Sequence, residues 1–344
     1  MAHRADFNRV NPSLRNMHNE LIKDLGEREL IRRIAQFMPK DQTSDDCAFI
    51  KLKKNNLLIN TDLLVEKTHF TNETISPLDL GWKAVTANLS DLISSGCDEI
   101  IGIKIGLVLT RETEWSWVKN LYEGINLALC KYGGLILGGD CSRGSERTIA
   151  ITAFGTQGEL ILRRYFSSPQ EIILTTGIHG LSKFGFDIKK NKISKKDLLN
   201  KSILIQDSLN AFCRPKPKFK IINKISKSRR SNQKLEIGCT DSSDGLYQAI
   251  LDLATESKCK AVIDYNKIPK HKFWPDGQEW DEYYFFGGED YELIFSLPRS
   301  WADHLMKIED SVFEIGYFEK GEPAIQIDNL QNKSFSAKSI FSHF

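Results

Sequence analysis

The stretch SPLDLGWKAVTANLSDLISSG, from Ser76 to Gly96, carries the signals that begin and end a helix. Ser76 is a typical N-cap residue, Pro77 suits the first helical position, and Asp79 places an acidic side chain in the first turn. Gly96 is a residue at which a helix can stop. The sequence therefore predicts a helix between these two ends.

One face of this predicted helix combines small residues with a carboxylate. Four residues follow the i, i+3, i+4, i+7 spacing of a single stripe: Ala84, Ala87, Asn88 and Asp91. An isolated buried charge is very unfavourable, so an Asp91 that faces inward needs a partner or a metal ion. The alternative is a solvated Asp91 on a mostly apolar helix.

Strand patterns lie on both sides of this helix. CAFIKL and LLINTDLLVE, joined by the polar residues 53–56, predict a β-hairpin, and TIAITAFGT predicts a further strand. A short helix over 26–38 precedes the hairpin, and a second long helix over about 114–132 ends at a glycine pair. The apolar run LILGG then leads into Asp140.

The alternation of strands, helices and Gly/Asp-rich turns begins again near residues 163–169. EIILTTG, CKAVIDY and LIFSLP are predicted strands, LYQAILDLATES is a predicted helix, and FFGGEDYE is a predicted loop. The sequence therefore predicts an α/β protein with a flexible extension over 1–25 and two domains over 26–160 and 161–344. The lysine-rich segments KKNKISKK and KSRRSNQK are predicted to be solvated loops.

Composition excludes several classes of function. The chain of 344 residues has a formal net charge of +2, without the basic footprint of a nucleic-acid-binding protein. No run approaches the ~20 apolar residues of a membrane span, and the N-terminus lacks the apolar core of a secretory signal. Seven cysteines without a C-x-x-C pair argue against a disulfide framework or a structural zinc site and favour a reducing cytoplasm.

The stretch CTDSSDG, from Cys239 to Gly245, concentrates acidic and hydroxyl side chains where a predicted strand meets a predicted helix. Helix N-termini favour anionic side chains, so one interpretation is a capped helix start. The other interpretation is half of a metal–phosphate site in which Asp241 and Asp244 both have a role.

Further acidic residues occur at Asp45-Asp46, Asp62, Asp91 and Asp140. In the hairpin, a three-residue loop would put Asp46 and Asp62 on one face, and a four-residue loop would not. Converging carboxylates repel one another unless cations lie between them. Oxygen ligands without a His/Cys cluster favour Mg²⁺ over zinc, and Mg²⁺ sites of few carboxylates usually hold substrate phosphates as well.

The usual phosphate-binding and nucleophile motifs are missing from the sequence. There is no G-x-x-x-x-G-K-[ST] loop, no set of protein-kinase motifs, no G-x-S-x-G elbow and no Cys/His pairing that indicates a nucleophile. The glycine pairs at 138–139 and 287–288 permit close approach of the backbone to a ligand.

Seven motifs occur in order along the chain: GEREL, SDDCAFI, NTDLLVEKTHF, DLGWKAVTANLSDLISSG, LILGGDCSRG, DSSDGL and GGEDYELIF. This ordered set resembles the thiamine-monophosphate kinase family, which belongs to the superfamily of aminoimidazole ribonucleotide synthetase. The resemblance covers nearly the whole chain, from about Gly26 to the C-terminal FSHF. LGWKAVTANLSDL together with GGEDYEL favours this family over its superfamily relatives.

The resemblance implies a two-domain α/β (α+β) fold whose N-terminal mixed sheet pairs with that of a second subunit into a barrel-like homodimer. It also implies that ATP phosphorylates thiamine monophosphate to thiamine diphosphate with release of ADP, the last step of thiamine diphosphate biosynthesis. Several Mg²⁺ ions would orient the two phosphates and offset their charge in an in-line displacement. The accepting phosphate oxygen is already ionised near neutral pH, so no general base is required, and none is evident.

The functional residues of the family map onto positions of this chain. The implied metal ligands are Asp46, Asn60, Thr61, Asp62, Asp91, Asp140, Asp241 and Asp244. The implied ATP contacts are Tyr122, Gly139, Asp140, Arg164 and Ser243. The implied contacts of thiamine monophosphate are His69, Glu289 and Phe341.

The chain departs from the family pattern without losing a proposed metal-binding carboxylate. Ser44 replaces the glycine of GDD, and Cys141 replaces the threonine after GGD. Ser242 replaces the isoleucine of DISDGL, and the segment YFSSPQE after Arg164 lacks the usual glycines. Asn60 replaces a serine and can contact Mg²⁺ through its amide oxygen or through its main chain.

Two alternatives belong to other functional classes or to other branches of the superfamily. One is another ATP-using enzyme of the selenophosphate or aminoimidazole ribonucleotide synthetase type. The first of these needs a reactive Cys or selenocysteine near a Gly-rich N-terminus, and this N-terminus has neither. The other alternative is a non-catalytic, metal-stabilised nucleotide-binding protein, and the retention of every acidic position argues against it.

Overall fold

The computed structural model of the protein describes residues 29, 32, 45, 47–50, 56–194, 196–230, 233–275 and 277–329. The elements named below belong to one compact unit within residues 41–340. The predicted extension 1–25, most of the predicted helix 26–38, Asp46 and Phe341 lie outside the described residues.

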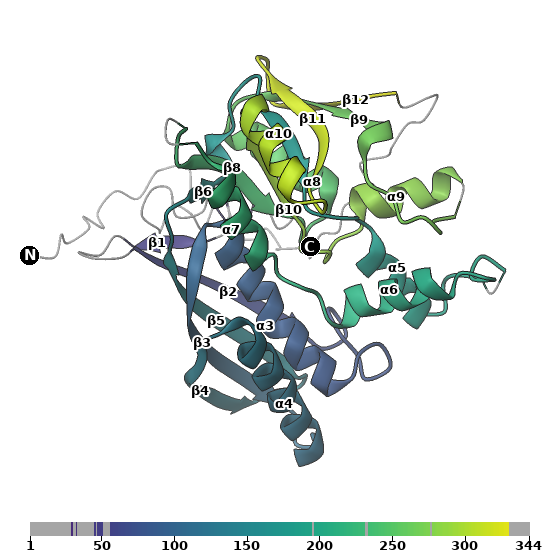
Figure 1. The fold of residues 1–344 in the computed structure, drawn as a ribbon. Helices are drawn as coiled ribbons and strands as arrows, with labels where there is room; N and C mark the ends of the chain where they lie inside the picture. Colours follow the sequence, from purple (N-terminus) through teal and green to yellow (C-terminus); the bar gives the residue numbers. More distant parts are fainter. Residues whose placement is uncertain are drawn as a thin grey trace, which may run out of the picture. The chain divides into compact units, whose positions relative to one another are not determined.

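The first sheet is built from the apolar runs of the N-terminal half (Figure 1). Its described strands, in the order in which they pair, are β1 (Ala48–Ile50), β2 (Leu57–Val65), β5 (Thr148–Gln157), β3 (Cys97–Leu109) and β4 (Leu135–Arg143). Neighbouring strands are antiparallel except β3 and β4, which are parallel. A parallel pair needs a long crossover, and the helix between these two strands supplies it.

The predicted hairpin is confirmed as β1 and β2. Ala48 lies opposite Ile59 in this pair. Paired residues share a face of the sheet, and a three-residue loop would pair Ala48 with Asp62 instead. The register found is therefore not the one that puts Asp46 and Asp62 on one face.

Two helices cover one face of the first sheet (Figure 1), and both were predicted. α3 (Pro77–Ser94) has Ser76 as its N-cap, and the Ser76 hydroxyl accepts a hydrogen bond from the backbone N–H of Asp79. α4 (Trp115–Tyr132) ends at Gly133, whose φ of +97° suits glycine.

The two helices pack closely because each carries a glycine at the contact. A Cβ on Gly124 of α4 would lie 1.8 Å from the carbonyl oxygen of Leu78. A Cβ on Gly81 of α3 would lie 2.0 Å from the carbonyl oxygen of Leu121. This close contact fixes α3 and α4 to each other beside the sheet.

The described residues leave the opposite face of the first sheet uncovered. Alternate residues of β5, such as Ile149 and Ile151, are buried beneath the helices, and the residues between them are partly exposed. On the uncovered face, Leu63 of β2 is 54% exposed and Leu137 of β4 is 48% exposed. Apolar side chains therefore remain on the surface of this face.

The second sheet is mixed and follows in the C-terminal half. Its described strands, in pairing order, are β12 (Ala324–Asp328), β9 (Lys260–Asp264), β11 (Phe313–Glu319), β7 (Ile172–Thr175), β10 (Leu293–Leu297), β8 (Glu236–Asp241) and β6 (Ile161–Arg163). The strands predicted from EIILTTG, CKAVIDY and LIFSLP are confirmed as β7, β9 and β10.

Helices lie on both faces of the second sheet. The described helices of this half are α5 (Leu181–Lys189), α6 (Ser202–Cys213), α7 (Phe219–Ser228), α8 (Leu246–Glu256), α9 (Gln278–Phe286) and α10 (Arg299–Ile308). Ile173 belongs to the same core cluster as Leu253 of α8, whereas Leu174 belongs to the cluster of Trp301 of α10. Adjacent strand residues point to opposite faces, so α8 and α10 cover opposite faces. The predicted mixed α/β fold class is confirmed.

Some predicted loops are partly helical. Phe285 and Phe286, the first two residues of FFGGEDYE, are the last two residues of α9. Phe285 is buried in the aromatic core of this half. Lys189 ends α5, and Lys227 and Ser228 end α7, whereas the described remainder of both lysine-rich segments lies outside helices and strands. No helix in the described part of the chain is both long and apolar enough to cross a membrane.

Candidate functional site

Asp91 points from α3 toward β2. The side-chain amide of Asn60 donates to Asp91 Oδ2 at 2.8 Å and to Asn88 Oδ1 at 3.1 Å. Asp91 therefore faces the sheet, unlike the solvated Asp of the alternative interpretation. Asn60 Oδ1 is buried and has no hydrogen-bond partner among the described residues. A buried acceptor without a donor beside a carboxylate is an environment that suits a cation.

The acidic turn CTDSSDG joins β8 to α8. Asp241 Oδ1 accepts hydrogen bonds from the backbone N–H and the hydroxyl of Ser243, and Asp241 Oδ2 accepts one from Ser90 Oγ of α3 at 2.5 Å. The N-cap of α8 is Gly245, with φ of +93°, and no side chain caps this helix. The interpretation of the turn as a capped helix start is therefore wrong, because its carboxylates are not used as the cap.

A second loop, between α9 and β10, packs against this turn. The backbone N–H of Glu289 donates to Ser243 O at 2.7 Å. A Cβ on Gly288 would lie 2.5 Å from the same carbonyl oxygen, so glycine permits the close approach. The side chain of Glu289 forms an ion pair with the buried Lys83 of α3, with 2.8 Å between Nζ and Oε2.

Tyr291 is a buried residue whose hydroxyl is affected by several of the acidic side chains. It is 6% exposed and has a left-handed backbone with φ of +53°. Burial raises the pKa of the Tyr291 hydroxyl well above its usual range, and nearby carboxylates raise it further: those of Glu289, Asp62, Asp241 and Asp91. Three of the predicted metal ligands and one predicted substrate contact therefore act on the hydroxyl of a single buried residue.

Sequence reasoning missed Tyr291 and Lys83 as residues of this site. Both stand inside quoted motifs, Tyr291 in GGEDYELIF and Lys83 in DLGWKAVTANLSDLISSG. A lysine inside an otherwise apolar helical segment was the signal that could have identified Lys83, because buried lysines need a partner.

Thr61 and Asp140 lie apart from this group. Asp140 pairs across the sheet with Gly106, Gly106 with Ala150, and Ala150 with Leu63. These four paired residues share one face of the sheet, and Leu63 identifies it as the uncovered face. Thr61 lies on the same face, whereas Asn60 and Asp62 point toward the helices. The described strands β5 and β3 stand between β2 and β4, so Asp140 is about 14 Å from β2 at about 4.8 Å per strand.

The predicted nucleotide contacts fall at two places. Tyr122 of α4 is half-buried; burial and, secondarily, the neighbouring thiol of Cys141 raise its pKa. A Cβ on Gly139 would lie 1.9 Å from Ile105 O, which gives this glycine a structural role in the β3–β4 pair. Arg164 lies elsewhere, at the end of β6, where its Nε donates to Thr240 Oγ1 at 3.1 Å. Thr240 and Ser243 belong to the β8 strand and turn, so Arg164 is adjacent to the acidic turn.

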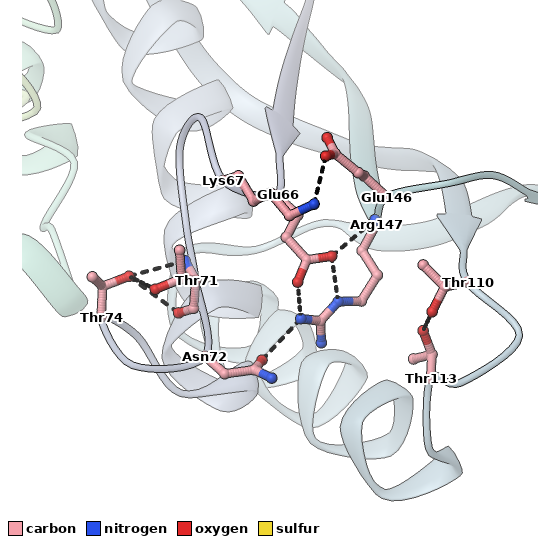
Figure 2. A network of polar contacts seen from close by, with 9 residues as sticks. All are labelled: Glu66, Lys67, Thr71, Asn72, Thr74, Thr110, Thr113, Glu146 and Arg147. Carbon is pink, nitrogen blue, oxygen red and sulfur yellow. Dashed lines mark hydrogen bonds and ion pairs between the residues drawn. The ribbon is translucent and has the colours of Figure 1, made fainter.

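His69 is presented by the loop between β2 and α3. Its Nδ1 accepts a hydrogen bond from the backbone N–H of Val65 at 2.9 Å. Figure 2 shows the network beneath this loop, in which Arg147 donates through Nε to Glu66 Oε2 at 3.0 Å and through Nη2 to Asn72 Oδ1 at 3.0 Å. The guanidinium also lies 4.5 Å from the centre of the Trp117 ring. Buried and multiply bonded, Arg147 holds the loop in place.

Within the part of the chain that the structure describes, no group of three or more His, Cys, Asp or Glu side chains is close enough to hold a metal ion by itself. The donors near Tyr291 are oxygen atoms: carboxylates and the amide oxygen of Asn60. Such a set fits a hard cation that takes further oxygen ligands from water or a bound phosphate.

Residues 44–157 match the family model of AIR synthase related protein, N-terminal domain. Together with the two sheets and the acidic site, this match places the chain in the AIR synthase related class. It is 40% identical over 325 residues to the thiamine-monophosphate kinase of Prochlorococcus marinus, across 94% of this chain and 98% of that protein. It is 31% identical over 332 residues to the thiamine-monophosphate kinase of Synechococcus elongatus, across 95% and 99% of the two chains.

A solved structure, AaThiL complexed with AMPPCP and TMP, matches with a TM-score of 0.80 and 25% identity over 95% of this chain and 100% of that chain. The chain belongs to the thiamine-monophosphate kinase family. The family assignment made from the seven motifs is confirmed.

Proposed function

We propose that the protein transfers the γ-phosphoryl group of ATP to thiamine monophosphate and releases ADP and thiamine diphosphate. The observation that carries the proposal is the pair of carboxylates held along α3, in a chain of this family: Asp91 accepts from Asn60 of β2, and Asp241 of the acidic turn accepts from Ser90. The AaThiL structure, which contains AMPPCP and TMP, supports the choice of both substrates.

Mg²⁺ fits the oxygen donors of the site. The buried Asn60 Oδ1, which lacks a partner among the described residues, stands beside Asp91 and fits a ligand through the amide oxygen rather than the main chain. The proposed ligands are Asp46, Asn60, Thr61, Asp62, Asp91, Asp140, Asp241 and Asp244. Bound Mg²⁺ would supply charge neutralisation between the phosphates of donor and acceptor.

The residues of the chain orient the reactants. Arg164, beside the acidic turn, is placed to donate charge-assisted hydrogen bonds to ATP phosphate, and Ser243 lies in that turn. The proposed ATP contacts also include Tyr122, Gly139 and Asp140. His69 and Glu289, with Phe341 outside the described residues, are the proposed contacts of thiamine monophosphate. The acceptor phosphate oxygen is ionised near neutral pH, so orientation and electrostatics suffice without a general base.

We further propose a homodimer that covers the exposed face of the first sheet. Strand β2 is paired on both sides by β1 and β5, so it offers no free edge to a second copy. The apolar surface lies instead on the face that carries Leu63 and Leu137, and along β4, where Leu135 is 69% exposed. A second copy on this face would bury that surface and would lie beside Thr61 and Asp140.

A coupled ADP-release assay tests the proposed reaction. Purified protein with ATP and Mg²⁺ should release ADP with thiamine monophosphate, and the product should be thiamine diphosphate. Thiamine, inorganic phosphate and selenide serve as alternative acceptors, and EDTA should abolish turnover. Absence of thiamine diphosphate with folded protein, excess Mg²⁺ and both substrates would overturn the proposal.

A further inference from the structure

One face of α3 contacts both loops of the acidic site. Lys83 and Ser90 are buried and are seven residues, or two helical turns, apart. Ser90 donates to Asp241 of the β8–α8 turn, and Lys83 donates to Glu289 of the α9–β10 loop. The two loops are themselves joined by the hydrogen bond from Glu289 N to Ser243 O.

Lys83 is unusual because it is a lysine that is only 3% exposed. Its Nζ lies 2.8 Å from Glu289 Oε2 and 4.1 Å from the centre of the Phe212 ring. The carboxylate and the ring face both stabilise an ammonium group that has lost its water. Lysine at this position therefore has a defined, restricted geometry.

Glu289 is held at one end and open at the other. Its side chain is 36% exposed, and its backbone adopts φ of +65°, which is unfavourable for a residue with a Cβ. The backbone N–H is bonded to Ser243 O, and Oε2 is bonded to Lys83. Among the described residues Oε1 has no hydrogen-bond partner, so it is available as an acceptor.

We propose that Lys83 is a positioning residue for substrate recognition: it fixes Glu289 so that Oε1 accepts a hydrogen bond from the pyrimidine amino group of thiamine monophosphate. The proposal rests on the proposed function and deepens it. The ion pair is neutral as a whole, so Glu289 acts as a hydrogen-bond acceptor for the amine rather than as a counter-ion for the thiazolium ring. Lys83 thereby governs recognition of the end of the substrate that carries no phosphate.

The test compares Lys83→Met with Thr86→Val, a matched control in the same buried helix face. The Thr86 hydroxyl donates to backbone carbonyls of α3 and does not contact Glu289. Lys83→Met should raise the KM for thiamine monophosphate about tenfold or more, as expected for loss of a charged hydrogen bond, and should leave the KM for ATP and kcat within about twofold. Lys83→Arg should restore part of the affinity, and Thr86→Val should behave like wild type.

A substrate variant locates the contact. Oxythiamine monophosphate carries a hydroxyl in place of the pyrimidine amino group, so wild type should use it less well than thiamine monophosphate, and Lys83→Met should lose most of this preference. If Lys83→Met does not fold, Glu289→Gln changes the exposed partner and should raise the same KM with the KM for ATP unchanged.

Two results would overturn the inference while the proposed function stands. One is a folded Lys83→Met variant whose kcat and KM for thiamine monophosphate both equal those of wild type. The other is a Glu289→Gln variant whose KM for thiamine monophosphate is unchanged. A folded wild-type protein that does not phosphorylate thiamine monophosphate would overturn both. A fall in melting temperature alone, with unchanged KM and unchanged preference, would assign Lys83 a purely structural role.

Discussion

Asp91 and Asp241 come from different elements, yet each accepts a hydrogen bond from the element that it faces. Asn60 donates to Asp91, and Ser90 donates to Asp241. These donors orient the two carboxylates. At the residue scale Asp91 and Asp241 are therefore held by neutral side chains, whereas Glu289 is held by the ammonium group of Lys83.

Asp91→Asn should separate catalysis from folding. The amide keeps the shape of the side chain but removes a negative charge next to the buried Asn60 Oδ1, so kcat should fall by about two orders of magnitude or more. The melting temperature without Mg²⁺ should stay close to that of wild type, because carboxylate repulsion is relieved at the same time. Steady-state kinetics measures kcat, and a thermal melt measures the melting temperature. Near-normal turnover would mean that Asp91 is not part of the site.

Protonation of His179 should weaken the fold in acid. His179 is fully buried, its Nε2 is 2.7 Å from Thr175 Oγ1, and its Nδ1 has no partner among the described residues. Burial, with a smaller effect of Lys218, lowers its pKa from 6.5 to about 3. Because the folded protein favours neutral His179, this group contributes to the free energy of unfolding above pH 6.5. That contribution is lost as the pH falls toward 3.

The free energy of unfolding should therefore fall by up to about 1.4 kcal/mol per pH unit below pH 6.5 through this group. Urea titrations of wild type and His179→Gln between pH 7 and pH 4 measure the slope. The variant should be less stable at pH 7 and show a shallower slope. Equal slopes would mean that His179 does not titrate with folding.

At the residue scale, only part of the site could be predicted from the sequence. The stripe through Asn88 and Asp91 could be predicted, because helical spacing is local information. Its partner Asn60 could not, because a contact between β2 and α3 depends on how the helix lies on the sheet. The same holds for Ser90 and Asp241, which are 151 residues apart in the chain.

At the scale of elements, α3 is predictable from its ends and also central to the site. Its cap, its proline and its following glycine are all local signals, and the structure has each of them. Strand β3 lacked such signals, because Gly102 and Gly106 interrupt an apolar run that fits neither a helix nor a strand clearly. Helix α9 was missed because its aromatic residues are buried by tertiary packing rather than along one stripe.

Gly124→Ala should destabilise the protein although alanine is the better helix former by about 1 kcal/mol. The added Cβ would meet the Leu78 carbonyl at 1.8 Å, so α3 and α4 would have to separate. A thermal melt should show a lower melting temperature for Gly124→Ala. Asn126→Ala, at an exposed position of the same helix, is the control and should be neutral or slightly stabilising. A stabilised Gly124→Ala would mean that the helices can move apart without cost.

At the scale of the whole molecule, the order of seven motifs allowed the fold to be predicted more completely than local patterns did. Periodicity alone gave the hairpin, α3, α4 and α8, whereas the family resemblance implied a two-domain fold with an N-terminal mixed sheet that pairs with that of a second subunit. Neither source gave the strand that is exposed at the edge of the first sheet. That depends on pairing order, and among the described strands β1 and β4 lie at the two edges.

The homodimer should be measurable as a mass. Light scattering at micromolar concentration should give twice the chain mass of 39.2 kDa for wild type. Leu63→Lys should shift the mass toward the monomer, because it would place a charge in the proposed interface. The chain should remain folded, because the Leu63 side chain is already 54% exposed. Lys119→Met, at an exposed position of α4, is the control. A wild-type monomer would contradict the proposed interface.

The spacing of Lys83 and Ser90 on α3 restricts which insertions and deletions this family of folds can tolerate. One residue added between them would rotate the two side chains by about 100° relative to each other and separate them by about 1.5 Å more. Lys83 and Ser90 could then no longer contact Glu289 and Asp241 together. Length variation among relatives should therefore collect in the surface connections, and the segment from Lys83 to Ser90 should keep a constant length. An engineered single-residue insertion there should impair turnover more than an equal insertion after Lys190.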